Sequence, residues 1–216
     1  MADGLLVAVC RVHALLPDRG NGVTGIDKRP VTAAVRVSAF GLFADVQADR
    51  RHHGGEDQAV YAYAEEDVAP FVRELGEEIP PGRFGENLRT RGVDVTGAVL
   101  GERWQVGDRA VLEVTYPRTP CGTFERRMGR PGWQDRFREH GAPGAYLRVL
   151  RAGSIRAGDP VRVLDRPAHG VTIGDWFTRQ DPRDAETLLA AEAAGSLRIP
   201  AKLRHHAERA LRRAPA

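Results

Sequence analysis

The sequence is poor in cysteine and in aromatic residues. Its 216 residues include two cysteines, and Trp, Tyr and Phe together make up 6%. Two cysteines are too few for the disulfide framework that staples small secreted domains. Because no charged, apolar and small-residue leader opens the chain, we expect a reducing, cytoplasmic location.

Long hydrophobic runs are also missing. The longest apolar stretches, such as residues 5–10, fall far short of the roughly 18 consecutive residues that a membrane span needs. We therefore expect no membrane partner. At roughly 150 residues per domain, the length predicts one sizeable domain, with or without a small appendage.

Lysine is scarce, since Lys28 and Lys202 are the only lysines among 32 basic residues. Coding bias explains the arginine surplus as well as selection for function does. The planar fork of arginine grips phosphate or carboxylate, so the surplus is compatible with an anionic ligand without identifying one. The basic segment 201–216 is most simply a solvated helix face, and docking on an acidic protein or nucleic acid stays open.

Strand patterns dominate the first three quarters of the sequence. Apolar or alternating residues bounded by glycine-containing turns predict strands over residues 5–16, 31–40, 98–106, 110–115, 145–150 and 161–164. Many short strands indicate a barrel or a sandwich.

Helical spacing appears in two places before the C-terminal region. Val68, Phe71, Val72 and Leu75 share one helical stripe, and a second helix surrounds Trp133 and Phe137. Beyond residue 167 the chain becomes rich in alanine and arginine, which predicts helices over 184–194 and 201–213. We expect a mixed α+β fold, mainly β, with a main domain at 1–168 and a small helical domain at 169–216.

The segment YPRTPCG at residues 116–122 carries the strongest chemical signal. Pro117 and Pro120 hold the preceding residues extended, so Cys121 is expected on a rigid, non-regular segment. Arg118 would favour the thiolate, which is the nucleophilic and metal-binding form of cysteine. Cys10 lies in an apolar strand pattern and is expected to be a small buried hydrophobe. From these residues alone, a purely structural Cys121 also stays open.

Three other segments are less specific. His52 and His53 lie in the polar segment 45–61, but zinc sites usually show spaced ligand pairs, so zinc is not favoured. Asn87, in the segment 82–88, can donate and accept hydrogen bonds to a heterocycle, although a surface turn explains the segment equally. The segment 24–31 is either a phosphate-facing loop or a connection into a strand. No Walker or dinucleotide glycine pattern decides between these alternatives.

Taken in order, five motifs resemble one known family. They are TGIDKRPV at 24–31, QAD at 47–49 with HHGG at 52–55, FGENL at 84–88, PRTPC at 117–121 and YLRVL at 146–150. This set resembles the MOSC family, named for the C-terminal domain of molybdenum cofactor sulfurase, and especially its stand-alone bacterial YiiM-like branch. The resemblance covers roughly two thirds of the chain, from residue 24 to residue 165.

The resemblance implies a β-barrel that holds molybdenum-molybdopterin and a three-helix domain at the C-terminus. It also implies reduction of an N-hydroxylated small molecule, such as a hydroxylaminopurine, to the amine. The cysteine that matches Cys121 is the molybdenum ligand in that family. On this basis we predict catalytic roles for Cys121, Arg118 and His53, and cofactor binding by Lys28, Asn87, Arg118, Thr119 and Cys121.

The sequence also departs from the pattern of that branch. Ala44 stands where glycine is frequent, and Gln58 and Thr123 stand where lysine is frequent. Loss of cations near the site would alter the grip on an anionic cofactor, unless neighbouring arginines compensate.

Partners follow from the chemistry. The chain has no flavin, haem or iron–sulfur signature, so a reductase would need a separate electron donor of the flavoprotein or ferredoxin type. A homodimer stays open, and nucleic acid is not favoured. The alternative function is a sulfur carrier, in which Cys121 bears a persulfide for metal–sulfur cluster assembly.

Overall fold

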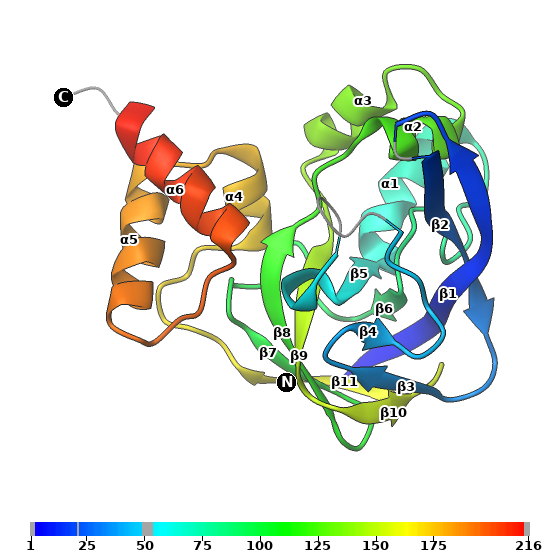
Figure 1. The fold of residues 1–216 in the computed structure, drawn as a ribbon, viewed down its shortest axis with the longest axis horizontal. Helices are drawn as coiled ribbons and strands as arrows, with labels where there is room; N and C mark the ends of the chain where they lie inside the picture. Colours follow the sequence, from blue (N-terminus) through cyan, green and yellow to red (C-terminus); the bar gives the residue numbers. More distant parts are fainter. Residues whose placement is uncertain (1–2, 21, 49–53, 214–216) are drawn as a thin grey trace.

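The fold is organised around a closed β-barrel (Figure 1). The computed structural model describes residues 3–20, 22–48 and 54–213. Pairing of β1 with β11, where Gly4 lies opposite Val161, closes the ring. In ring order, its seven strands are β1 (Gly4–Asp18), β6 (Leu88–Arg91), β5 (Val60–Ala64), β9 (Ala145–Arg151), β8 (Ala110–Pro117), β7 (Arg103–Val106) and β11 (Pro160–Asp165). This confirms the predicted mixed α+β fold that is mainly β.

Strand β1 is long because different parts of it pair with different neighbours. Its first half pairs with β6 and β11, and its second half pairs with β2 (Gly22–Val31). The register with β2 shifts on both sides of Ala14. Such bulges bend a strand and increase its twist while pairing continues on either side. The segment 24–31 is therefore a strand of this hairpin, not a phosphate-facing loop.

Strands β5 and β6 are parallel, with Ala62 opposite Leu88. Parallel neighbours need a crossover connection, and α1 (Glu65–Leu75) supplies it. Neither strand was predicted from the sequence. All five residues of β5 are buried, so the strand lacks the polar and apolar alternation that marks a half-exposed strand.

Two predicted strands prove shorter than their sequence patterns. Val31 ends β2, and after a turn β3 (Val35–Ser38) pairs with β4 (Gly41–Leu42) and β10 (Gly153–Ile155) in a separate small sheet. The alternation over 31–40 thus spans two sheets. In 98–106, only β7 is a strand of the barrel. The apolar residues 98–100 before β7 are buried in a turn. This turn is joined by a β-bridge between Val99 and Thr172 to the chain that enters the C-terminal helices.

Most of the aromatic residues gather in one cluster beside the barrel. It lies among α1, α2 (Gly122–Met128) and α3 (Trp133–His140), and includes Tyr61, Tyr63, Phe71, Phe84, Phe124, Trp133 and Phe137. The predicted helices at α1 and α3 are confirmed. Helix α2 was not predicted, because its short sequence offers only two buried residues, Phe124 and Met128.

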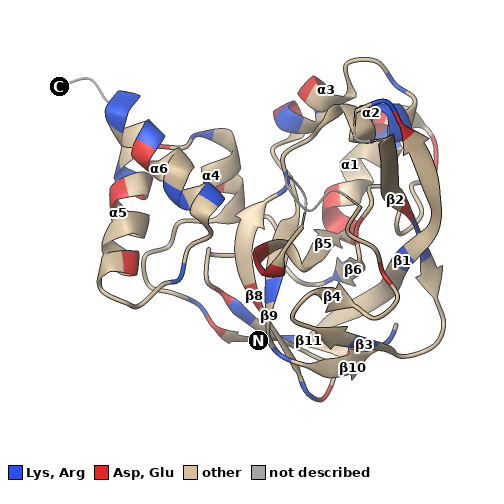
Figure 2. Ribbon diagram, in the orientation of Figure 1, with Lys and Arg blue, Asp and Glu red and all other residues tan. Residues whose placement is uncertain are grey.

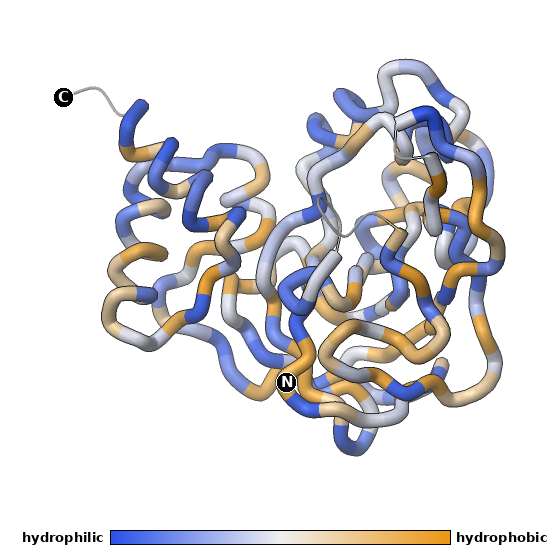
Figure 3. The backbone as a smooth tube through the Cα atoms, in the orientation of Figure 1, coloured by the Kyte–Doolittle hydropathy of each residue, from blue (hydrophilic) through white to orange (hydrophobic). Residues whose placement is uncertain are grey.

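Three helices follow the barrel: α4 (Ile173–Thr178), α5 (Pro182–Ala193) and α6 (Ala201–Arg213). The bounds of α6 match the prediction, and α5 begins two residues earlier than predicted. Hydrophilic and hydrophobic stretches alternate along them (Figure 3). Leu203 and Ala207 of α6 belong to the same buried core as Trp104 of the barrel. Within the described ranges, every helix is too short or too polar to cross a bilayer. A domain boundary at residue 168 stays a prediction.

A hydrogen bond joins α6 to the barrel strand that leads toward Cys121. The Tyr116 hydroxyl of β8 lies 2.7 Å from Nδ1 of His206, and the Lys202 ammonium lies 5.1 Å from the centre of the same tyrosine ring. Burial, followed by the charges of Lys202, His205 and Arg209, lowers the pKa of His206 below its usual value of 6.5. The neutral imidazole can therefore accept the hydrogen bond at neutral pH.

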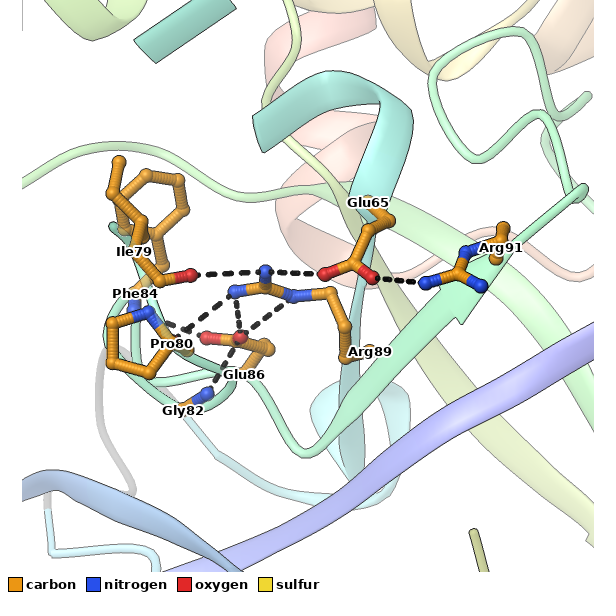
Figure 4. A network of polar contacts seen from close by, with 8 residues as sticks. All are labelled: Glu65, Ile79, Pro80, Gly82, Phe84, Glu86, Arg89 and Arg91. Atoms are coloured by element: carbon orange, nitrogen blue, oxygen red, sulfur yellow. Dashed lines mark hydrogen bonds and ion pairs between the residues drawn. The ribbon is translucent and has the colours of Figure 1, made fainter. Parts of the chain in front are cut away.

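The loop between α1 and β6 is held by a buried ion pair (Figure 4). Glu86 and Arg89 are both 0% exposed and bond to each other. The Glu86 carboxylate also accepts hydrogen bonds from the backbone N–H groups of Gly82, at 2.7 Å, and Phe84, at 3.0 Å. Because its charge satisfies backbone donors as well as a guanidinium, Glu86 determines the path of this loop.

We predict that Glu86→Gln lowers the free energy of unfolding by about 3 kcal/mol, because Arg89 would keep a buried charge without its buried partner. Its remaining carboxylate partner would be the partly exposed Glu65, at 3.4 Å. Urea unfolding measures the change. Glu78→Gln is the matched control, since Glu78 is exposed and forms no ion pair in the described structure; it should change stability by less than about 0.5 kcal/mol. Equal effects in the two variants would contradict this assignment.

We also predict that the contact between Tyr116 and His206 makes stability depend on pH. A histidine with a lowered folded-state pKa stabilises the fold above its unfolded pKa and loses that contribution as pH falls below about 6.5. His206→Asn should therefore reduce the loss of stability between pH 7.5 and pH 5.0. His205→Asn, on the exposed face of the same helix, should retain most of the parental pH dependence, because burial and not the charge of His205 is the main cause of the lowered pKa of His206. Thermal unfolding at both pH values tests this, and parallel curves for parent and His206→Asn would refute it.

Candidate functional site

The candidate site is a cavity beside the N-terminus of α2. Its walls come from β2, the loop 45–48, the 3-10 helix η1 (Glu56–Gln58), β5, the turn at Gly85 and the segment leading into α2. These elements are distant in sequence, so the barrel closure brings them together. The polar lining consists of Thr24, Lys28, Asp45, Gln47, Gln58, Asn87, Arg118, Cys121 and Thr123, together with the hydroxyl-bearing Tyr61 and Tyr146.

The thiol-bearing Cys121 lines this cavity. It is half-buried and precedes the first residue of α2 in an extended conformation, with φ −138° and ψ 170°. This confirms the predicted non-helical setting after Pro120. Cys10, by contrast, is fully buried, and burial followed by the nearby Glu86 raises its thiol pKa to about 12. Of the two cysteines, Cys121 alone lines the cavity.

Arg118 places a buried positive charge beside Cys121. Its side chain donates to the Phe84 carbonyl at 2.7 Å, and its guanidinium carbon lies 3.8 Å from the centre of the Phe124 ring. No carboxylate among the described residues pairs with it. Burial disfavours the cation, but Tyr61, Tyr146 and the Cys121 thiol outweigh burial and raise the pKa of Arg118. The charge therefore persists and can attract a thiolate or an anionic ligand.

Two tyrosines complete the wall around Arg118. The Tyr61 and Tyr146 rings lie 5.3 Å apart, and the Tyr61 hydroxyl donates to the Pro143 carbonyl at 2.8 Å. Burial raises the pKa of Tyr146, with Arg118 opposing the shift, so its phenol is protonated at neutral pH. Tyr146 is the first residue of the YLRVL motif at 146–150, and no role was predicted for it from the sequence. Only the fold shows that it lines the cavity with Cys121.

Asp45 organises the opposite wall. Its carboxylate lies 2.5 Å from the Lys28 ammonium, and it accepts from the Asn87 amide and the Val12 backbone N–H, both at 2.8 Å. Lys28 is thus an ion-paired cation, with a charge that is largely compensated before any ligand binds. Asp45 is a site residue that sequence reasoning missed; its position in a segment dense with polar residues was the available signal.

The Asn87 side chain is engaged mainly by the protein itself. Its amide nitrogen donates to Asp45 and to the Cys10 carbonyl, and its oxygen accepts from the Tyr61 backbone N–H. Both donors are therefore already used, although the side chain lines the cavity. Asn87 ties β1, β5 and the Asp45 loop together, and this positioning role precedes any contact with a ligand.

Gln58 leaves a polar atom unmatched in the same cavity. Its side-chain oxygen is buried and has no hydrogen-bond partner among the residues that the structure describes. Buried polar atoms are normally satisfied, so this one is available to a ligand N–H group. Nearby, Gly85 has φ +79° and lies so close to Ile26 that a side chain there would approach Ile26 to 3.0 Å. Glycine thus keeps this part of the cavity open.

The structure brings together four of the six predicted site residues. Lys28, Asn87, Arg118 and Cys121 all line the cavity. Thr119 is exposed and faces a neighbouring hollow between the barrel and the C-terminal helices. His53 lies outside the described residues. The functional role assigned to each residue stays a prediction.

Ala44, the first departure noted above, has an unusual backbone. Its φ is +59°, in the left-handed region where an L side chain is disfavoured and glycine is not. It directly precedes Asp45. The loop that delivers Asp45 to Lys28 and Asn87 is therefore built with some backbone strain.

Fold and cavity together define the class: a mainly β barrel protein whose cavity is lined by a cysteine and a buried arginine. More particularly, the chain belongs to the MOSC domain family, whose sequence profile matches residues 49–162. This confirms the resemblance seen in the sequence motifs.

Individual relatives agree with this assignment. An uncharacterized protein of Bacillus subtilis, YflK, is 34% identical over 170 residues, covering 78% of this chain and 76% of YflK. A protein of Gibberella moniliformis named "Reductase" is 32% identical over 151 residues, 68% of this chain but only 27% of that protein. The crystal structure of YiiM from Geobacillus stearothermophilus superposes with a TM-score of 0.77 at 25% identity, covering 96% of this chain and 99% of YiiM.

We predict that Ala44→Gly raises the free energy of unfolding by about 1 kcal/mol, because it relieves a left-handed alanine. Ala48→Gly, in the same exposed loop but without a positive φ, should instead lower it by roughly 0.5 kcal/mol through the greater freedom of the unfolded chain. Urea unfolding of both variants provides the comparison. Destabilisation by Ala44→Gly would show that the loop is not strained at this residue.

Proposed function

We propose that this protein is a molybdenum-cofactor-dependent oxidoreductase that reduces N-hydroxylated compounds, such as hydroxylaminopurines, to amines. One observation carries the proposal: Cys121 and Arg118, whose guanidinium has no carboxylate partner among the described residues, line the cavity of a MOSC-family barrel. MOSC domains are in general associated with binding of the molybdenum cofactor. The reductase name of the Gibberella relative points to the same class of reaction.

The residues of the cavity fit such a cofactor chemically. A thiolate is a soft ligand suited to molybdenum, and Cys121 supplies one. Arg118 offers a buried cation to the anionic part of the cofactor, and Gln58 offers an unmatched acceptor to a heterocyclic N–H. We expect Lys28 to contribute less than its charge suggests, because Asp45 already pairs with it.

The proposed reaction breaks one N–O bond. The hydroxylamine, two protons and two electrons give the amine and one water molecule. When bound, the cofactor would supply the two-electron chemistry, while the protein supplies position, charge and protons. The electrons must come from a separate donor, for which we retain a flavoprotein or a ferredoxin.

Tyr146 is the proton donor that the cavity favours. Its phenol remains protonated at neutral pH because burial raises its pKa. It faces the cavity that Cys121 and Arg118 also line. A positioned phenol can deliver a proton to a departing oxygen, and Arg118 can stabilise negative charge that develops there.

Molybdenum analysis of protein produced in cells that make the cofactor tests this proposal. The parent should contain near-stoichiometric metal, and Cys121→Ser should lose most of it, since a hydroxyl is a poor substitute for a soft thiolate ligand. Cys10→Ala is the matched cysteine control and should retain the metal, because Cys10 is buried away from the cavity. Circular dichroism would verify that all three proteins are folded.

Two results would overturn the proposal. The first is a folded parent without molybdenum, and the second is equal metal content in the parent and Cys121→Ser. If a metal-free parent accepts sulfur from a cysteine desulfurase and Cys121→Ser does not, the sulfur carrier becomes the better assignment. If the metal-loaded parent does not reduce an N-hydroxylated purine, the assignment of the cofactor would stand and this substrate class would be rejected.

A further inference from the structure

A second concave surface lies between the barrel and the C-terminal helices. Two adjoining hollows share Phe177, Thr178, Gln180 and His206, and we call the combined surface the helix cleft. One side comes from Tyr116, Pro117 and Thr119 of the barrel and from α3. The other side comes from α4, the start of α5 and α6. None of this surface belongs to the cavity that contains Cys121.

The helix cleft is lined by positive charge. Its charged lining consists of Arg138, Arg179, Arg209 and Arg213, with His206 between them, and no aspartate or glutamate is part of the lining. Arg138 and Arg179 have carboxylate partners on their own helices. Arg209 and Arg213 are exposed and have no ion-pair partner in the described part of the chain. Figure 2 shows the basic residues along α6.

The floor of the helix cleft is aromatic. Phe177 of α4 packs against Phe137 of α3, with ring centres 6.5 Å apart. An aromatic centre bordered by arginines is the composition of a protein–protein interface, where aromatic residues and arginine are enriched. A free anion would need only the charges.

The helix cleft also reaches the segment that holds Cys121. Thr119, on its edge, is two residues from Cys121 in the chain. Lys202, in the first turn of α6, interacts electrostatically with Cys121. Burial lowers the pKa of the Lys202 ammonium, and the charge of Cys121 opposes that shift. A partner seated in the helix cleft would therefore lie beside the chain segment that carries Cys121.

We propose that the helix cleft is the docking surface for an acidic electron-donor protein. This inference rests on the proposed function, because a molybdenum reductase whose sequence carries no flavin, haem or iron–sulfur signature must receive two electrons from a partner. Electron transfer weakens steeply with distance, so the donor must dock near Cys121. Complementary charge speeds such an encounter and orients the partner. Nucleic acid could pair with the arginines, but its binding would not require a position near Cys121.

The test measures binding of two acidic probes, a flavodoxin and a [2Fe–2S] ferredoxin, to the full-length protein by biolayer interferometry. The parent should bind at least one probe at 50 mM NaCl and lose affinity at 300 mM, because salt screens the attraction. Arg209→Glu/Arg213→Glu should weaken that binding about tenfold or more. Arg73→Glu/Arg109→Glu is the matched control: it makes the same change in net charge at two exposed arginines outside the helix cleft, and it should weaken binding less than threefold.

Three outcomes would overturn the docking surface: no binding of either probe by the parent, equal weakening by both double variants, or loss of single-stranded DNA binding in Arg209→Glu/Arg213→Glu with probe binding intact. The last would assign the helix cleft to nucleic acid. Thermal unfolding must show that both variants are folded, which their exposed positions favour.

A chemical reductant separates this inference from the proposed function. Turnover driven by dithionite and methyl viologen needs no docked protein, so Arg209→Glu/Arg213→Glu should retain parental turnover and molybdenum content. It should lose turnover only with the protein donor. If the parent has no dithionite-driven turnover, the proposed function fails, and the binding measurements still decide whether the helix cleft docks an acidic protein.

Discussion

The carboxylate of Glu86 fixes the part of the chain on which the candidate site depends. It is fully buried with Arg89 and accepts hydrogen bonds from two backbone N–H groups of the loop 82–86. A buried charge of this kind is tolerated only when every oxygen finds a donor. The loop it fixes carries the Phe84 carbonyl, which in turn anchors Arg118. The polar core thus positions the cation that faces Cys121.

The two walls of the cavity treat positive charge differently. Lys28 is paired with Asp45, whereas Arg118 is buried, has no carboxylate partner in the part of the chain that the structure describes, and lies near two aromatic rings. A compensated cation mainly shapes the wall, while an uncompensated one attracts an anion or a thiolate. This contrast makes Arg118, more than Lys28, the cation of the cavity that is available to an anionic ligand.

The C-terminal helices share the hydrophobic core of the barrel and add a surface lined by arginines beside it. Their apolar residues share the barrel core, and His206 bonds to Tyr116 on the strand that leads to Cys121. Their exposed arginines line a cleft that ends beside the same segment. One group of elements therefore supports the strand that leads to Cys121 and carries a surface lined by arginines.

The sequence alone determined the mainly β fold, the helices at α1, α3 and α6, the extended setting of Cys121 and membership of the MOSC family. Local rules suffice there, because proline geometry, helical periodicity and ordered motifs act over a few residues. Strands β5 and β6 were missed, since buried strands lack alternation. The sequence also did not show that Asp45, Gln58 and Tyr146 lie together in the cavity. Thr119 lines the helix cleft and not the cavity. Only the tertiary structure decided these points, because barrel closure, not sequence spacing, sets which side chains meet and which charges stay unpaired.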